Sequence, residues 1–180
     1  MKTIVLSYSK TGNNEELAKS IAKELAVEHI KVTERKKRTM GSIVADLTFH
    51  RTPKVQPAPT IIGEYDLILF LGPVWMGNVA TPLRGYMKFL SKNPQKYAYI
   101  SLCGGADGPN PKLADELKNR VGREPEALIE LHIADLLPSD PKPTRNDTMA
   151  YRVNIEEIEK LTESVIRRLR EMVPDEDGPG

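Results

Sequence analysis

Short apolar runs alternate with amphipathic stretches along most of this chain. The run Leu67–Leu71 contains no polar residue, which indicates a strand that is buried on both faces. Four other runs have the length and composition of strands, so the five predicted strands cover Thr3–Leu6, Ile30–Thr33, Tyr65–Leu71, Tyr97–Leu102 and Ala127–Ile133. Strands that alternate with helices predict a doubly wound α/β fold, in which a five-stranded parallel sheet carries helices on both faces.

Polar residues that precede the amphipathic stretches predict where the helices begin. Asn13 is the expected N-cap of the first helix, because Glu16 follows it as in a capping box. The pairs Thr81-Pro82 and Asn110-Pro111 have the order cap then proline, which favours two further helix starts. Gly122 fits the end of the second of these helices.

The last helix is predicted to begin after Asn154, with Glu157 completing a second capping box. The residues expected on its inner face are Ile158, Leu161, Val165, Leu169 and Met172. Residues 174–180 then form a polar tail. The predicted organisation is therefore a single domain over residues 1–173, followed by that tail.

Two segments do not follow the alternating pattern. Residues 35–60 contain the basic run Arg35–Arg38, a predicted short helix with Ile43, Val44 and Leu47, and a proline-rich return to the third strand. The basic run is interpreted as a solvated stretch, with docking of an acidic partner or of a dinucleotide phosphate as the alternative. Residues 138–147 are rich in proline and charge, and both a lid and a dimer contact are open for them.

Composition restricts the class of protein. The chain has 180 residues, of which 39% are hydrophobic and 28% charged, as expected for a folded, soluble domain. Its net charge of +1 gives no reason to expect nucleic acid or an anionic membrane as a partner, and no apolar run is long enough to span a bilayer. Cys103 is the only cysteine and no signal-peptide core follows Met1, so we expect a cytoplasmic protein without disulfides. Since the histidines His29, His50 and His132 have no ligand spacing, no metal site is expected.

Three loops at the carboxyl ends of the predicted strands form the candidate site, because open α/β sheets bind ligands at that end. The first loop lies between the first strand and a helix N-terminus, where backbone amides and the helix dipole favour an anion. It lacks both the Gly-Lys-Ser/Thr ending of a Walker loop and the Gly-x-Gly-x-x-Gly pattern, so it favours a monophosphate, with an ordinary capped turn as the alternative. The candidate phosphate-binding residues are Ser9, Lys10, Thr11, Gly12, Asn13 and Asn14.

The other two loops are suited to a planar ring. Trp75 in the second loop could stack on the ring, although a tryptophan that only covers the edge of the sheet is the alternative. The third loop offers its backbone to the edge of a heterocycle, and Cys103 at its start is interpreted as a packed thiol. Together the three loops predict a mononucleotide with a large ring. The candidate residues are Pro73, Val74, Trp75, Met76, Gly77 and Asn78 in the second loop, and Cys103, Gly104, Gly105, Ala106 and Asp107 in the third.

In order and position, these loops resemble those of the flavodoxin-like family of FMN proteins. Ser9–Asn14 is similar to the phosphate signature Ser/Thr-x-Thr-Gly-Asn-Thr, Pro73–Asn78 to the loop that flanks the isoalloxazine ring near N5, and Cys103–Gly108 to the loop that meets its pyrimidine edge. The similarity spans residues 2 to 133. It is greatest with a bacterial and archaeal branch that is often labelled flavodoxin or NAD(P)H-dependent oxidoreductase. The resemblance implies the strand order 2-1-3-4-5, the cofactor FMN, and the three loops as its binding site.

The chain departs from the family pattern in three ways. Asn14 replaces the usual threonine, which exchanges a hydroxyl for an amide that can still donate to phosphate. The third loop has no aromatic residue to cover the outer face of the ring, and this favours access by a second molecule and hence turnover. The near-neutral net charge differs from the acidic character of the family members that carry electrons.

The resemblance therefore implies an FMN-binding redox protein that transfers electrons by one- or two-electron chemistry at the flavin. In the family, a peptide beside N5 flips on one-electron reduction, and Gly77-Asn78 matches its position. No catalytic side chain is required. The alternatives are a small NAD(P)H-dependent quinone-type reductase and a flavin-free α/β interaction module. The expected partner is a redox protein or an NAD(P)H or quinone molecule, and a homodimer is an open alternative.

Overall fold

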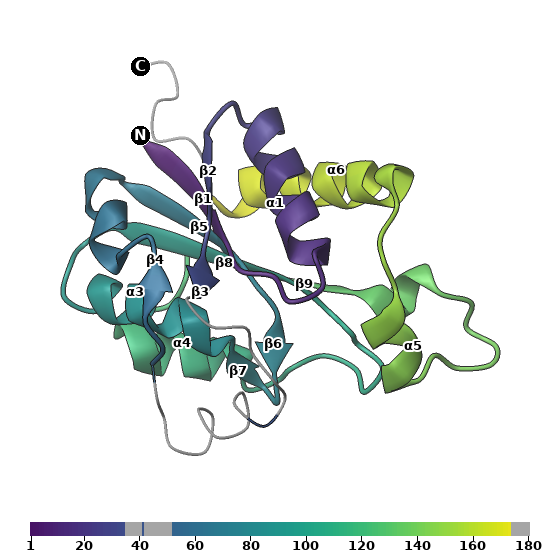
Figure 1. Cartoon of the computed structure of the whole chain (residues 1–180). Helices are drawn as coiled ribbons and strands as arrows, with labels where there is room; N and C mark the ends of the chain where they lie inside the picture. Colours follow the sequence, from purple (N-terminus) through teal and green to yellow (C-terminus); the bar gives the residue numbers. More distant parts are fainter. Residues whose placement is uncertain (35–40, 42–51, 174–180) are drawn as a thin grey trace.

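The computed structural model describes residues 1–34, 41 and 52–173, and their central feature is a five-stranded parallel sheet (Figure 1). The strands in sheet order are β2 (Glu28–Lys31), β1 (Thr3–Ser7), β5 (Leu67–Leu71), β8 (Lys96–Cys103) and β9 (Ala127–His132). Each neighbouring pair in this sheet is parallel. The predicted sheet is confirmed, and its order is 2-1-3-4-5 when these strands alone are numbered.

The apolar content of a strand matches its place in the sheet. Every residue of β5 is buried, and β8 is buried from its second residue to its last, because helices cover both faces of the sheet there. β2 lies at the edge with exposed ends, and it begins earlier than the predicted Ile30–Thr33. Thr33 belongs instead to β3 (Thr33–Glu34), which pairs antiparallel with β4 (Val55–Gln56).

Helices cover both faces of the sheet (Figure 1). On one face, α1 (Asn13–Glu24) and α6 (Ile155–Met172) pack against each other and share an apolar cluster with Val5 and Ile129. On the other face, α3 (Arg84–Leu90) and α4 (Leu113–Val121) contact each other and share a second cluster with Phe70 and Tyr99. The sheet therefore separates two apolar cores, as expected for a doubly wound fold.

Short elements connect these layers. β6 (Val74–Trp75) and β7 (Asn78–Val79) form a hairpin after β5, and α5 (Arg145–Ala150) lies in the chain between β9 and α6. The sequence pattern predicts neither the hairpin nor α5. Among the described residues, 3₁₀ helices span η1 (Pro59–Glu64), η2 (Thr81–Leu83) and η3 (Ile133–Leu136).

The structure corrects three predicted helix caps. α1 starts from Gly12, which has a φ of 98° and whose carbonyl accepts the first helical hydrogen bonds, so Asn13 is not the N-cap. Thr81 begins the 3₁₀ helix η2 without capping it, and α3 follows directly. Asn110 precedes α4 without capping it, because its side-chain amide donates to Glu130 on β9. Polar side chains next to a helix can thus have more distant partners.

The remaining helix signals have a mixed outcome. Asn154 and Glu157 form both hydrogen bonds of the predicted capping box at the start of α6, and Gly122 ends α4 with a φ of 84°. Both predictions are confirmed. Met172 is 45% exposed and so does not lie on the inner face of α6, where Ile166 is buried.

Several sequence predictions fall outside the described residues. These are the basic run Arg35–Arg38, the short helix with Ile43, Val44 and Leu47, and the polar tail over residues 174–180. Among the helices that the structure describes, none has the combination of length and apolarity needed to cross a bilayer.

Candidate functional site

The carboxyl ends of β1, β5 and β8 lead into the three predicted loops. Because these strands are parallel neighbours, the first loop (residues 9–14), the second loop (residues 73–78) and the third loop (residues 103–107) begin at the same edge of the sheet. β1 lies between β2 and β5, so the strand order reverses at β1. This reversal is the topological switch point at which open α/β sheets bind ligands.

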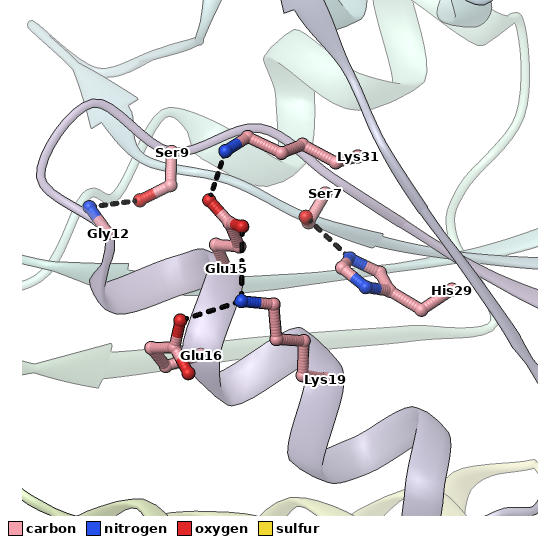
Figure 2. Close-up of polar contacts among 8 residues, drawn as sticks. All are labelled: Ser7, Ser9, Gly12, Glu15, Glu16, Lys19, His29 and Lys31. Atoms are coloured by element: carbon pink, nitrogen blue, oxygen red, sulfur yellow. Dashed lines mark hydrogen bonds and ion pairs between the residues drawn. The ribbon is translucent and has the colours of Figure 1, made fainter.

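The first loop forms an open turn at the start of α1 (Figure 2). The Gly12 N–H donates to the Ser9 Oγ over 3.0 Å, and a Cβ built on Gly12 would meet no atom of the described residues within 4 Å. The N–H groups of Glu15 and Glu16 donate to the Gly12 carbonyl. The Asn13 and Asn14 N–H groups therefore remain, within the described part of the chain, as first-turn donors without a protein acceptor.

The Asn14 side chain does not point toward a ligand. Its Nδ2 donates to the Leu102 carbonyl over 2.8 Å, and its Oδ1 accepts from the Leu102 N–H over 3.0 Å. The ladder between β5 and β8 ends at the pair Leu71–Ile100, so the amide of Asn14 continues the hydrogen bonding where β5 has stopped. One N–H of this amide is thus used by Leu102, and the backbone N–H of Asn14 has no acceptor among the described residues, so the contact of Asn14 with phosphate stays a prediction.

The Asn13 side chain also turns inward. Its Nδ2 donates to the Tyr151 carbonyl and its Oδ1 accepts from the Val153 N–H, so it connects α1 to the segment between α5 and α6. Both asparagines are buried. The side chains of the first turn thus hold the loop in place, while its backbone amides are the groups that can bind an anion.

Charges near the first loop are balanced within the protein (Figure 2). Lys31 Nζ lies 2.6 Å from Glu15 Oε2, and Lys19 Nζ lies 3.2 Å from Glu15 Oε1 and 2.8 Å from Glu16 Oε1. Burial favours a higher pKa for Glu15, but the hydrogen bonds from Lys31 and Lys19 outweigh it and lower the pKa. Glu15 is therefore ionised and compensates Lys31 and Lys19, so these two lysines are already paired within the protein.

The second loop is a tight β-hairpin. Trp75 and Asn78 pair across it, and the two central residues have positive φ, 52° at Met76 and 75° at Gly77. Two positive φ values are typical of a type I′ turn. Asn78 Nδ2 donates to the Met76 carbonyl over 3.0 Å, and the Met76 side chain is 80% exposed. The hairpin thus places a half-buried Trp75 at its base and an exposed apolar side chain at its tip.

Trp75 contacts the residue that follows β1. Its ring packs edge-on against Tyr8, with 5.8 Å between the ring centroids. Tyr8 is buried, and its hydroxyl donates to Glu34 over 3.0 Å. Trp75 therefore packs at the β1/β5 switch point, and its exposed part is available to a planar ligand.

The third loop packs against two elements at its back. A Cβ on Gly105, which has a φ of 74°, would lie 2.4 Å from His132 Cβ, and a Cβ on Gly104 would lie 2.9 Å from the Thr148 hydroxyl of α5. Asp107 at the end of the loop forms an ion pair with Arg145 over 2.7 Å. The segment 138–147, open as a lid or a dimer contact, thus reaches the third loop through Arg145. Glycine is required at position 105 because any side chain would strike His132.

Cys103 is buried at the end of β8. Burial, with the nearby Glu130 carboxylate as a smaller cause, raises the pKa of its thiol. The sequence misses the residues around this thiol, since Glu130 and His132 become its neighbours only through the register of β8 and β9.

Surface hollows elsewhere are less suitable. One of about 660 Å³ lies between α1 and α6, and one of about 970 Å³ lies near the amino ends of β1 and β5. No residue of the three loops lines either hollow. The strand order therefore favours, as the candidate site, the edge of the sheet at which the three loops begin.

The strand order and the helices on both faces define this chain as having the flavodoxin-like doubly wound α/β fold. Solved structures show the same fold. A flavoprotein from Lactobacillus acidophilus in complex with FMN is 20% identical, with a TM-score of 0.59 over 72% of this chain and 92% of that chain.

Structures of two proteins assigned as flavoproteins are also similar. The protein from Bacteroides eggerthii has a TM-score of 0.63 and is 12% identical, and the match covers 92% of this chain and 98% of that chain. The protein from Bacteroides uniformis has a TM-score of 0.57 and is 19% identical, and the match covers 82% of this chain and 94% of that chain. No protein-family model and no curated protein matches the chain.

Proposed function

We propose that this chain binds FMN and transfers electrons through it. The observation that carries the proposal is the first turn of α1, where the Asn13 and Asn14 N–H groups have no acceptor among the described residues and the space beside Gly12 is open. Sheets of this order bind ligands at the adjoining switch point, and in flavodoxin the ligand there is FMN. The Lactobacillus acidophilus relative, which shares the fold, is a complex with FMN.

Each of the three loops can contact a different part of FMN: the phosphate, the face of the ring or the polar edge of the ring. The Ser9 hydroxyl and the two first-turn amides would hold the phosphate, since neutral donors at a helix N-terminus suffice for an anion. Trp75 would pack on the ring, and the backbone of residues 103–107 would meet its polar edge. Bound FMN supplies one- and two-electron transfer. The residues of the chain hold it in place and limit its contact with water.

Electron carriage to a redox partner protein is the first form of this proposal. A reductase that uses NAD(P)H or a quinone is the second, and it is supported by the small residues Gly104–Ala106, which leave the third loop without an aromatic side chain to cover the ring. Steady oxidation of NADH or NADPH with a quinone acceptor would select the reductase. Reduction only by a protein partner would select the carrier.

Binding of FMN and of riboflavin to the flavin-free full chain tests the proposal, because riboflavin has the same ring without the phosphate. We expect FMN to bind at least about tenfold more tightly, since one hydrogen bond to a charged group contributes about 1.5–3 kcal/mol. Ser9→Ala should weaken FMN binding and leave riboflavin binding unchanged. Ser91→Ala, at the exposed end of α3, is the matched control and should change neither.

Equal affinities for FMN and riboflavin would remove the phosphate site from the proposal. A full chain that takes up neither flavin would contradict the proposal as a whole, and would favour the flavin-free interaction module.

A further inference from the structure

The ends of β8 and β9 bring three metal-ligating side chains together behind the third loop. Cys103 lies opposite His132 in the strand register, and Glu130 is two residues before His132 on the same strand. Side chains two residues apart on a strand share one face of the sheet, and so do side chains directly opposite in register. A sulfur, an imidazole and a carboxylate are therefore placed on one face, which is the face covered by α4.

The donor atoms of these three residues lie close together. The Cys103 sulfur, a Glu130 oxygen and a His132 ring nitrogen are all within 4.8 Å of one another. The distance between His132 Nε2 and Glu130 Oε2 is 3.9 Å, which is too long for a hydrogen bond. The three groups thus converge without bonding directly to one another, as donors arranged around a common centre would.

His132 Nε2 is the second, independent sign of a ligand. This nitrogen is inaccessible to solvent and has no hydrogen-bond partner in the described part of the chain, although the side chain as a whole is 16% exposed. Buried polar nitrogens are nearly always paired, so an unpaired one needs a physical reason. A cation bound between Nε2, Glu130 and Cys103 would satisfy it.

Neighbouring residues hold these side chains in place. Asn110 donates to Glu130 Oε2 through its Nδ2, over 2.6 Å, and through its backbone N–H, over 3.2 Å. On the other side of the imidazole, Asp135 Oδ2 lies 3.7 Å from His132 Nδ1, near the ring but beyond hydrogen-bond distance.

From this geometry we infer that Cys103, Glu130 and His132 form a binding site for a divalent transition-metal ion of the zinc type. Zinc accepts thiolate, imidazole and carboxylate ligands in tetrahedral geometry, and three protein ligands leave one position for water. Metal–ligand bonds of about 2.0–2.3 Å place ligand atoms about 3.3–3.8 Å apart, so a pair of donors at the 4.8 Å limit would have to approach by about 1.0–1.5 Å. The inference does not rest on the proposed flavin function, although Cys103 also begins the third loop.

A bound ion would connect β8, β9 and the third loop. Because Gly105 packs directly on His132, an ion that fixes the imidazole would also fix the backbone of the third loop. The alternative is that His132 lies between Glu130 and Asp135 without any metal. Direct measurement of metal binding distinguishes these two states of the site.

Zinc titration of the purified full chain by calorimetry, after treatment with EDTA, tests the inference. We expect one zinc ion per chain, and a loss of affinity of about tenfold or more in Cys103→Ser and in His132→Gln, since weakening even the outer shell of a metal site costs about 10–100-fold. His29→Gln, on β2 at the other edge of the sheet, is the matched control and should bind zinc as the unchanged chain does.

Two results would overturn the site. One is the absence of binding at micromolar zinc, and the other is an affinity in His132→Gln equal to that of His29→Gln. Should a substituted chain fail to fold, alkylation of Cys103 in the unchanged chain gives the answer. Zinc should slow this alkylation markedly, and an unchanged rate would contradict the inference.

Discussion

Met76 has a backbone conformation that L-residues with long side chains rarely adopt. Its φ of 52° at the tip of the β6–β7 hairpin places it in the left-handed region, next to Gly77 in the same region. Type I′ turns favour Asn-Gly at these two positions, so methionine is the exception here. Strained residues of this kind occur often at functional sites. This one projects an exposed side chain beside the proposed ring site.

Replacement of Met76 by asparagine should stabilise the protein. Asparagine enters the left-handed region more readily, so we expect Met76→Asn to raise the free energy of unfolding by about 1 kcal/mol in urea denaturation. Met149→Asn is the matched control, because Met149 is also exposed but lies in the helical conformation of α5. An equal gain from both substitutions would show that the backbone of Met76 is not the cause.

His29 makes the stability depend on pH in a defined direction. Burial lowers the pKa of His29 from its usual 6.5 and outweighs the opposing effect of the nearby Glu15 carboxylate. Its contribution to stability is therefore present above pH 6.5 and is lost as the pH falls through the lower folded-state value. The urea midpoint of the unchanged chain should fall more steeply from pH 7 to pH 5 than that of His29→Gln. Parallel curves would contradict this assignment.

At the scale of elements, one amide connects the first helix to the centre of the sheet. Asn14 on α1 satisfies both backbone groups of Leu102 on β8, at the level where β5 no longer supplies a partner. The family pattern has threonine at this position, whose shorter side chain carries one oxygen in place of the two separate atoms, Nδ2 and Oδ1, that Asn14 uses for these bonds. The departure at Asn14 therefore has a structural reason.

Asn14→Ala should lower the free energy of unfolding by about 3 kcal/mol, because two buried backbone groups would lose their partner at about 1–3 kcal/mol each. Urea denaturation measures this loss. Asn119→Ala, on the exposed surface of α4, serves as the control and should change the value by less than about 0.5 kcal/mol. A loss below 1 kcal/mol for Asn14→Ala would mean that water replaces the amide.

The elements also show which parts of the structure the sequence could predict. Leu67–Leu71 was sufficient to place β5, since an unbroken apolar run of this length between turn residues is typical of a buried strand. Asn13 and Asn110 were wrong as caps, because their amides bond to residues distant in sequence. The start of α5 was missed, although Thr144 and Asp147, three residues apart in the sequence, form a capping box there.

At the scale of the molecule, the predicted architecture is confirmed, since the alternation of strands and helices predicted the doubly wound fold and the family resemblance implied the strand order. The candidate loops could be placed at one edge of the sheet from the parallel strands, but the contacts behind them could not. Cys103 and His132 lie far apart in the chain, and only the register of β8 and β9 makes them neighbours. Long-range contacts of this kind have no local signature in a single sequence.

The hydroxyls of three buried tyrosines form hydrogen bonds to segments that connect the helices and strands. Tyr86, Tyr97 and Tyr99 donate their hydroxyls to the carbonyls of Pro57, Arg123 and Gly72. Burial raises the pKa of all three well above the usual 10. Their contribution to stability is complete below pH 10 and is lost as the pH rises through the folded-state values.

In an alkaline titration followed by tyrosinate absorbance, these three tyrosines should ionise only as the chain unfolds. The circular dichroism signal of the folded chain should therefore be lost at the same pH at which the absorbance of these three tyrosinates rises. Tyr97→Phe should remove one tyrosine from the group that ionises on unfolding. Above pH 10 its urea midpoint should fall less steeply than that of the unchanged chain. Ionisation of all six tyrosines near pH 10 in a folded chain would contradict the assignment.

The pairing of Asn14 with Leu102 sets the separation between the head of α1 and the end of β8. A molecule that spans from the first loop to the third must match that separation, because neither side can slide without breaking the pair. The proposed site would then be selective for the distance between the phosphate and the ring of a nucleotide, and nucleotides with a longer or shorter link between them would bind less well.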